Sequence, residues 1–314
     1  MTRIVSFDGG GIRGVISLSL LIALEKDARV ALSEKVDVFA GTSTGAIIAV
    51  CLAMGMSASQ ILTLYTQNSR ALFKSVDPVL DHLLPLRAKY DNASLKALLQ
   101  RVVLQATGSA DGTLGMLNKK VIIPYIDLDD VKLHRWRLGV RENITQAGKD
   151  VSIVDAVMES TAAPTYFPSY QGCIDGGIGA NDPCLVAYCF LKGKKVLEKQ
   201  SSLLSFGTGY TKHFVPKGEN WGALSWLFHL NHKKEETIDP LMTVLFDVQE
   251  QLPSELCHLV MGEDFQKIDL ELKEAIGLDD TSKVAALIQE ASDFPKQQSQ
   301  QWSEIVHWTK MHFV

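Results

Sequence analysis

The chain has 314 residues, of which 46% are hydrophobic and 21% are charged. This balance is typical of a globular protein and excludes a disordered or fibrous chain. The length allows one large α/β domain or two smaller ones. The formal net charge is −5. No nucleic-acid polymer is therefore expected as a partner, because binding to a phosphate backbone needs a basic face.

Several features favour a cytoplasmic protein. The first residues soon become acidic and glycine-rich, which does not fit a cleaved signal peptide. The five cysteines lack metal-ligand spacing and are typical of free thiols in a reducing compartment. Glycines interrupt the apolar stretch 38–56, and the remaining run of about ten apolar residues is too short to span a membrane. Secretion without a cleaved signal is also compatible with these features.

The predicted elements alternate between strand and helix along the first two thirds of the chain. Strands are expected at 3–7, 36–40, 121–126, 133–140 and 202–206, and helices at 14–29, 44–54, 57–73, 91–104, 151–161 and 183–191. This order is typical of a three-layer α/β/α fold, in which helices cover both faces of a mainly parallel central sheet. Ligand sites of such sheets gather at the carboxyl ends of the strands, where two glycine-rich loops are expected here.

The first of the chemically informative motifs is Gly41-Thr42-Ser43-Thr44-Gly45, between a predicted strand and a predicted helix. It matches the G-x-S-x-G nucleophile elbow, in which a sharp turn raises a serine above the sheet. Gly41 and Gly45 remove the Cβ atoms that would clash in such a turn. Ser43 would then lie at a helix N-terminus, which favours negative charge. The alternative is an ordinary turn in which Ser43 is only the helix N-cap.

The second motif, Asp8-Gly9-Gly10-Gly11-Ile12-Arg13-Gly14, joins the first strand to the first helix. The N–H groups of Gly9, Gly10 and Gly11 can converge on an anion because no side chain blocks them, as an oxyanion hole requires. Arg13 can orient this loop or meet a phosphate. The same glycines also fit the dinucleotide fingerprint G-x-G-x-x-G, so a nucleotide-binding protein is the alternative. Glu34 has the spacing of the ribose-binding acid, but it precedes the second strand instead of ending it.

The third motif is Asp175-Gly176-Gly177, which taken alone is most often only a turn. It gains interest because Ser43 needs a base and the eight histidines are poorly placed to supply one. A carboxylate can serve alone if burial raises its pKa from near 4. A carboxylesterase of the α/β-hydrolase type, with a Ser-Asp-His triad, stays open as an alternative.

Together the three motifs resemble the patatin-like phospholipase family. The blocks 160–168 and 205–209 also look familial, and the resemblance covers roughly residues 1–210. It implies a patatin-like catalytic core over 1–210. The remaining residues, 211–314, are expected to form a mostly helical extension packed on the same domain, with extra helices in the C-terminal third.

The resemblance further implies a lipid acyl hydrolase of the phospholipase A or lysophospholipase type. Ser43 would attack an acyl ester, Asp175 would take its proton, and the glycine loop with Arg13 would hold the oxyanion. Neither a metal nor a cofactor is implied. The expected partners are a phospholipid or other acyl-lipid substrate and a transient membrane surface. A cyclic nucleotide or a protein is the kind of activator that the family leaves room for, and the oligomeric state stays open.

Contact with a membrane would need a local apolar or basic patch, because the net charge of −5 gives no general attraction to anionic lipid. The densest apolar cluster lies in the C-terminal third and is flanked by two lysines. Such a segment can lie in the headgroup region of a membrane, although a helix packed in the core is the favoured alternative. The cluster consists of Trp221, Leu224, Trp226, Leu227, Phe228 and Leu230, with Lys233 and Lys234 beside it.

Overall fold

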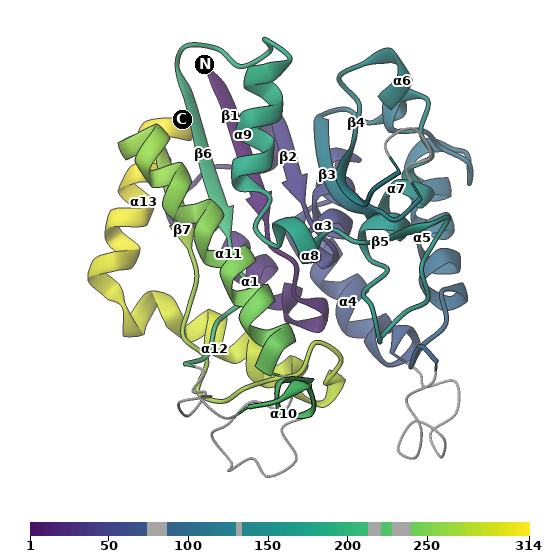
Figure 1. Ribbon diagram of the computed structural model, residues 1–314. Helices are drawn as coiled ribbons and strands as arrows, with labels where there is room; N and C mark the ends of the chain where they lie inside the picture. Colours follow the sequence, from purple (N-terminus) through teal and green to yellow (C-terminus); the bar gives the residue numbers. More distant parts are fainter. Residues whose placement is uncertain (74–86, 130–133, 213–220, 228–239) are drawn as a thin grey trace.

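The computed structural model describes residues 1–73, 87–129, 134–212, 221–227 and 240–314, and their centre is a seven-stranded sheet (Figure 1). The strands are β1 Thr2–Phe7, β2 Val38–Gly41, β3 Lys120–Asp127, β4 Arg137–Glu142, β5 Cys173–Asp175, β6 Ser201–Phe206 and β7 Phe265–Ile268. Their order is β4-β3-β2-β1-β6-β7, with β5 also beside β3. Strands β3, β2, β1, β6 and β7 are parallel, whereas β4 and β5 run antiparallel to β3.

Helices cover both faces of this sheet. The α-helices are α1 Gly14–Ala28, α2 Leu32–Lys35, α3 Thr44–Ala53, α4 Ala58–Leu72, α5 Ala93–Thr107, α6 Gln146–Lys149, α7 Ile153–Ser160, α8 Gly177–Ala180, α9 Cys184–Gly193, α10 Ala223–Leu227, α11 Pro240–Met261, α12 Val284–Gln297 and α13 Ser299–Phe313. Short 3-10 helices are η1 Gly11–Arg13, η2 Leu114–Met116, η3 Gly262–Asp264 and η4 Thr281–Lys283. Helices α8, α9 and α11 lie on the face toward the viewer in Figure 1, and α1, α3 and α12 lie on the other.

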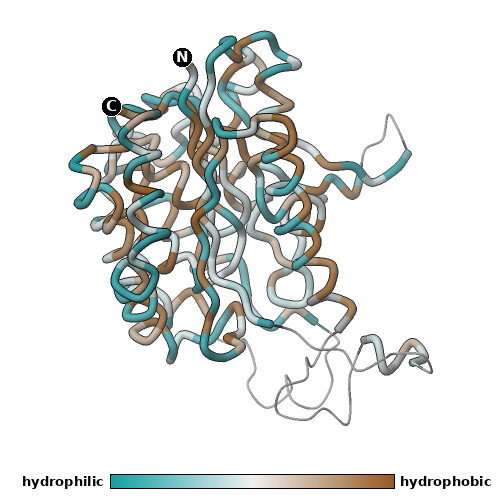
Figure 2. Tube along the Cα trace, turned by 90° about the vertical axis from the view of Figure 1, so that its left-hand side faces the viewer, coloured by the Kyte–Doolittle hydropathy of each residue, from teal (hydrophilic) through white to brown (hydrophobic). Residues whose placement is uncertain are grey.

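Alternate residues of the central strands pack into two separate hydrophobic cores, one on each face of the sheet. In β1, Val5 and Phe7 join the core under α1, α3 and α12, whereas Ile4 joins the core under α9 and α11. The other central strands alternate in the same way, because successive side chains of a strand point to opposite faces. Strands buried on both faces are mostly apolar, and the hydropathy-coloured trace is brown along parts of them (Figure 2), although Ser6, Ser202 and Ser205 are buried in these strands as well.

The prediction of an α/β fold with a mainly parallel sheet and helices on both faces is confirmed. The strand expected at 133–140 begins later, at Arg137, and 130–133 lie outside the described residues. Two strands were missed. Strand β5 has only three residues and β7 has four, with Gln266 and Lys267 at its centre, so neither carries a clear apolar pattern.

The C-terminal third contributes to the same sheet. Strand β7 pairs with β6, and α12 and α13 pack against α1. The indole Nε1 of Trp302 donates to Asp27 Oδ2 at 2.8 Å across that contact. Among the described residues, no helix is both long enough and apolar enough to cross a membrane.

The pairing of β3 explains how two distant segments meet. Strand β2 pairs with the first residues of β3, up to Ile122, and β4 runs along the opposite edge. Strand β5 pairs with the later residues, Tyr125 to Asp127, so it occupies the edge that β2 leaves. The end of β5 therefore lies beside the end of β2, which is where the predicted nucleophile follows.

Candidate active site

Ser43 lies in a strained turn between β2 and α3. Its backbone has φ 54° and ψ −121°, a conformation that costs a non-glycine residue on the order of 1–3 kcal/mol. The flanking glycines allow the close contacts of this turn. A Cβ on Gly41 would stand 2.0 Å from the carbonyl oxygen of Gly45, and a Cβ on Gly45 would stand 2.1 Å from that of Phe7. The local geometry is therefore that of a nucleophile elbow.

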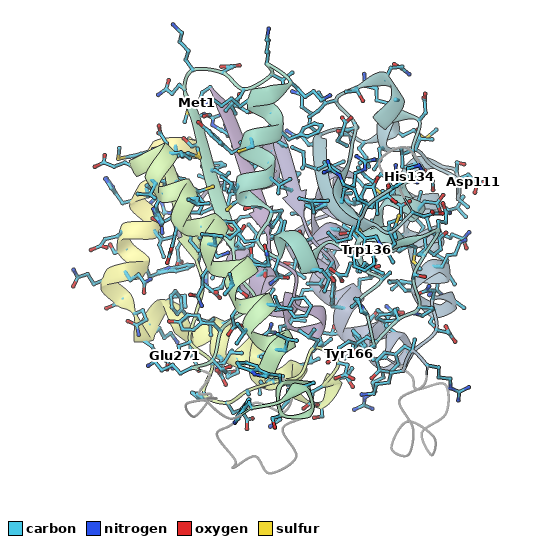
Figure 3. The ribbon with its side chains drawn as sticks, viewed as in Figure 1. Met1, Asp111, His134, Trp136, Tyr166 and Glu271 are labelled. Atoms are coloured by element: carbon cyan, nitrogen blue, oxygen red, sulfur yellow. The ribbon has the colours of Figure 1, made fainter. Side chains whose placement is uncertain are left out.

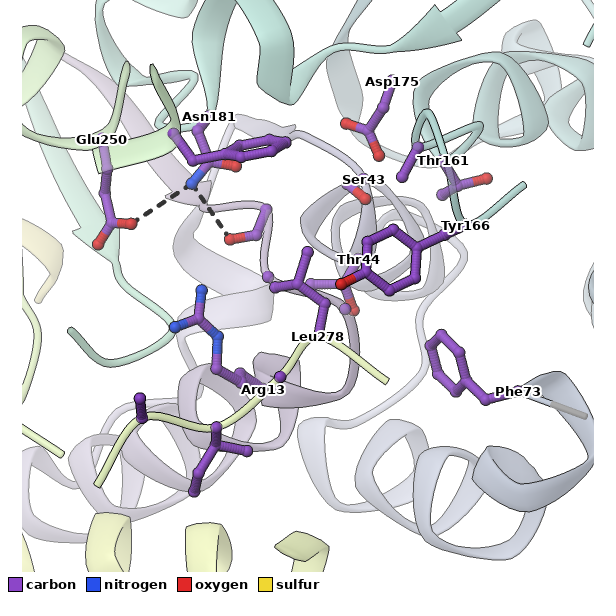
Figure 4. A pocket seen from close by; sticks show the side chains of 18 of the residues that line it. Arg13, Ser43, Thr44, Phe73, Thr161, Tyr166, Asp175, Asn181, Glu250 and Leu278 are labelled. Carbon is purple, nitrogen blue, oxygen red and sulfur yellow. Dashed lines mark hydrogen bonds between the residues drawn. The ribbon is translucent and has the colours of Figure 1, made fainter. Parts of the chain in front are cut away.

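Asp175 ends β5 and faces this turn. Asp175 is only 2% exposed, and Figure 4 shows its carboxylate directed toward Ser43. Burial raises the pKa of Asp175 to about 6, against the lowering effect of hydrogen bonds from the Ser43 side chain and the Gly177 N–H. The Gly177 N–H donates to Oδ1 at 2.7 Å. The carboxylate is thus a stronger base than an ordinary aspartate, yet it stays ionised at neutral pH.

Ser160 holds the two segments together. Its hydroxyl accepts the Ser43 N–H at 3.1 Å and donates to the Pro124 carbonyl at 2.6 Å. Its own carbonyl accepts the Gly176 N–H at 3.3 Å. Gly176 is pressed against β3, where a Cβ would meet the Pro124 carbonyl oxygen at 2.3 Å. The block 160–168, noted in the sequence only as familial, therefore fixes the distance between the elbow and Asp175.

The glycine loop lies against the elbow, because a Cβ on Gly9 would come within 3.4 Å of Ser43 Cβ. The Gly9 N–H is already used, since it donates to the Asn181 carbonyl at 3.0 Å. Within the described residues, the N–H groups of Gly10 and Gly11 form no hydrogen bond, and both glycines line the pocket. Of the three glycines predicted to bind the oxyanion, Gly10 and Gly11 are thus the two whose N–H groups have no described partner, and the oxyanion role itself stays a prediction.

Arg13 also lines the pocket. Its Nη1 donates to the Gly209 carbonyl at 3.2 Å, while its buried Nε has no hydrogen-bond partner among the described residues. The bond to Gly209 ties the start of α1 to the loop that follows β6, and the interpretation that Arg13 orients the glycine loop stays a prediction. The sequence interpretation of a phosphate contact stays a prediction.

A buried ion cluster lies under the glycine loop. Lys267 Nζ is 2.5 Å from Asp8 Oδ2 and 2.8 Å from Asp182 Oδ2, and it also donates to Ser205 Oγ at 3.2 Å. Burial and the charge of Asp182 raise the pKa of Asp8, whereas Lys267 holds the pKa of Asp182 below its usual range despite burial. The cluster anchors Asp8, the residue from which the loop starts. A buried charge is tolerated only with such partners.

The pocket around these groups has a volume of about 1060 Å³. In Figure 4, Arg13 and Glu250 lie on one side of Ser43, and Tyr166 and Phe73 lie on the other. Tyr166 and Glu271, both pocket residues, mark its two sides in the wider view (Figure 3). One wall is thus charged and the other is apolar, with Ser43 between them.

Three residues that line the pocket, Asn181, Glu250 and Leu278, were not singled out in the sequence. Asn181 donates to the Gly9 carbonyl and to Glu250 Oε2, each at 3.4 Å, and so links the loop to α11. Burial, followed by the charge of Asp269, raises the pKa of Glu250 to about 8. The Leu278 carbonyl accepts the Ile12 N–H at 2.8 Å. No local motif marks these residues, because their partners lie far away in the sequence.

Histidines do not reach the pocket in the part of the chain that the structure describes. None of its lining residues is a histidine, and none of the described residues form a cluster of three or more metal-binding side chains. Four histidines, His82, His213, His229 and His232, lie outside the described residues.

The apolar cluster of the C-terminal third is described only in part. Trp221 and Trp226 meet edge to face at 5.3 Å, and α10 packs against α11. Phe228, Leu230 and the two lysines lie outside the described residues. The choice between a membrane contact and core packing therefore stays open.

Acyl transfer to a serine requires a raised hydroxyl, a base within reach and N–H donors for the oxyanion, and the pocket brings together candidates for all three. A model of patatin-like phospholipases matches residues 5–188, and the chain belongs to the patatin-like phospholipase family. It is therefore an ester hydrolase of the kind that acts on acyl lipids.

The chain is also similar to individual proteins of known sequence or structure. Patatin-like protein 4 of Arabidopsis thaliana is 27% identical over an alignment of 327 positions, which covers 90% of this chain and 79% of the plant protein. A cGAMP-activated phospholipase of Escherichia coli (strain TW11681) is 27% identical over 59% of this chain and 54% of its own length. Among solved structures, VipD from Legionella pneumophila aligns with a TM-score of 0.42 and 14% identity, over 94% of this chain and 66% of VipD.

Proposed function

We propose that Ser43 and Asp175 form a catalytic dyad that hydrolyses fatty-acyl esters of phospholipids. Asp175 takes the Ser43 proton as Oγ bonds to the ester carbon. The intermediate then collapses, the alcohol oxygen leaves with that proton, and an acyl-enzyme remains. A water molecule then gives its proton to Asp175 and attacks the acyl carbon. The fatty acid leaves and the proton returns to Ser43.

The pKa of Asp175 supports this role. A base works best when its pKa lies near the working pH, and burial brings the pKa of Asp175 to about 6. The hydrogen bond from Ser43 also gives the proton a direct path. The hydrogen bond between the buried carboxylate of Asp175 and the half-buried hydroxyl of Ser43, at the strained elbow, is the observation that carries the proposal.

The oxyanion is assigned to the N–H groups of Gly10 and Gly11. Both line the pocket beside Ser43 and keep their donors free of other described groups. The N-terminus of α3 adds positive potential at the same place. Removing one such donor typically costs on the order of 10²–10³ in kcat.

The substrate class is a phospholipid or lysophospholipid met at a membrane surface. The family supplies the lipid substrate, and the apolar wall of the pocket supports a fatty-acyl group. Contact with the membrane is transient in this proposal, because a water-soluble enzyme must reach lipid that stays in the bilayer.

Labelling with a fluorophosphonate and mass spectrometry test the nucleophile. We expect a single adduct on Ser43, no adduct in Ser43→Ala, and strongly slowed labelling in Asp175→Asn. Ser57→Ala is the matched control, because Ser57 caps α4 at the surface and should leave labelling unchanged. An adduct that forms at the same rate in Asp175→Asn contradicts the dyad.

The Ser-Asp-His alternative is tested by histidine substitution. His82, His213, His229 and His232 lie outside the described residues, so each is changed to alanine in turn. The dyad requires that all four variants keep turnover of a soluble ester. Loss of turnover in one of them, with turnover kept in Asp175→Asn, would favour the triad.

We further propose that a cyclic nucleotide or a protein regulates the activity, without a part in the chemical steps. The support is one relative, described as a cGAMP-activated phospholipase, of which this chain covers 54%. Lipid hydrolysis is measured with and without cyclic dinucleotides. Equal rates would remove the nucleotide as activator and leave the dyad untouched.

A further inference from the structure

A second, smaller cavity lies behind the apolar wall of the pocket and shares four lining residues with it. We propose that this wall between α3, α4 and α5, here called the acyl arm, binds a long fatty-acyl chain and that Leu95 sets the chain length it accepts. This inference rests on the proposed role of Ser43. It adds the side of the site on which the chain lies and the residue that limits it.

The walls of the acyl arm are continuous from the elbow. Ile47 lies one turn after Ser43 on α3, Tyr65 and Leu72 come from α4, and Leu95 comes from α5; all four line the main pocket. Tyr65 does not add a free polar group, because its hydroxyl pairs with the Thr44 hydroxyl and donates to the Thr44 carbonyl at 3.1 Å. A methylene chain leaving the ester carbon would therefore meet apolar surface.

The same four residues also line the second cavity, a void of about 10 Å³ behind them. All of its walls are hydrophobic side chains. The walls not shared with the main pocket are Cys51, Leu64, Leu98, Leu99 and Val102. The side chains that line a void of this size lack van der Waals partners on that side. Of the four residues that border both spaces, Leu95 is the one that α5 contributes, so its side chain is assigned the limit between an acyl chain that ends there and one that extends toward α5.

The opposite side of the site is unsuited to an acyl chain. It carries Arg13, Lys212, Glu250 and Glu271, and covering such groups with a methylene chain would cost their hydration. Lys212 and Glu271 form an ion pair at 2.9 Å there. The polar remainder of the substrate is therefore assigned to this side and the acyl chain to the side of α5.

Hydrolysis of p-nitrophenyl butyrate and p-nitrophenyl palmitate tests the assignment, with kcat/KM measured for each. Leu95→Trp fills the arm and should lower the palmitate-to-butyrate ratio at least about tenfold, since one methylene in an enzyme pocket is commonly worth 10–200-fold. Leu95→Ala joins the two cavities and should shift the preferred acyl length upward across a series of esters. Val103→Ala is the control, because Val103 is buried on α5 and lines neither cavity.

The outcomes separate this inference from the dyad. Thermal unfolding of each variant shows whether it is folded, and the ratio of the two esters cancels any loss of active protein. If both Leu95 variants keep the wild-type ratio while butyrate hydrolysis still requires Ser43, the acyl arm is wrong and the dyad stands. A Val103→Ala ratio that falls as far as that of Leu95→Trp would also overturn the assignment. Butyrate hydrolysis that persists in Ser43→Ala refutes the dyad itself.

Discussion

Replacing Asp175 with asparagine should stabilise the protein while it abolishes activity. Burial raises the pKa of Asp175 from 3.8 to about 6, so the folded state binds the proton more tightly than the unfolded state. The stability gained from that proton is complete below the pKa that the carboxyl has in the unfolded state. It is lost as the pH rises through the pKa of the folded state, about 6. A shift of about two units corresponds to about 3 kcal/mol at pH 8.

Asparagine keeps the shape of aspartate and its acceptor for the Gly177 N–H, but it carries no charge to bury. With an unfolding entropy of about 2 cal/mol/K per residue, a gain of about 3 kcal/mol raises Tm by about 5 °C. Calorimetry of both proteins from pH 4 to pH 8 measures this difference. It should be largest at pH 8 and close to zero at pH 4, where the wild-type carboxyl is protonated in the fold.

Activity provides the second half of the test. In the wild type, kcat/KM should fall about tenfold per pH unit below pH 6, as the base becomes protonated. Asp175→Asn should lose about 10²–10⁴ in kcat/KM. The reasoning that the fold buries a desolvated charge at this position would be refuted by one result. In that result, Asp175→Asn is less stable than the wild type at pH 8, and the difference in stability does not vary with pH.

Three further substitutions, with Gly193→Ala as a control, test the surroundings of the site. Ser160→Ala removes the acceptor of the Ser43 N–H and should cost about 1–3 kcal/mol in unfolding free energy, together with a loss of kcat in ester hydrolysis. Gly45→Ala places a Cβ 2.1 Å from the carbonyl oxygen that ends β1 and should cost about 1–3 kcal/mol. Gly193→Ala, which meets nothing within 4 Å, should not lower Tm. Lys267→Met leaves two buried carboxylates without their cation and should cost about 3–5 kcal/mol in urea unfolding; an unchanged midpoint would contradict the anchoring role.

The sequence predicts those parts of the fold and site that depend on local constraints. The central strands are buried on both faces, so their composition alone indicates them. The elbow is equally local, because Gly41 and Gly45 are needed by contacts within five residues and with β1. Strand β5 was missed because three residues carry no period, although it places Asp175.

Other parts of the site depend on partners that no local pattern reveals. The Gly9 N–H is used by Asn181, a contact between segments 172 residues apart. Lys267 lies at a central position of the short strand β7. Its role as a counter-ion follows only from the pairing of β7 with β6. The C-terminal third was expected only as a helical extension, yet it supplies this cation and the carbonyl of Leu278 that holds the glycine loop.

The contrast between two buried aspartates separates structure from chemistry. Burial raises the pKa of both Asp8 and Asp175. Around Asp8 the Lys267 ammonium opposes that rise and ties the carboxylate into a closed network with Asp182. At Asp175 the opposing contributions are hydrogen bonds from Ser43 and the Gly177 N–H, with no described cation among them. A desolvated carboxylate without a counter-ion is costly, and perturbed groups of this kind gather at functional sites. Asp175 faces the Ser43 hydroxyl of the strained elbow, and the proposed role of Asp175 as general base would explain why the fold retains this cost.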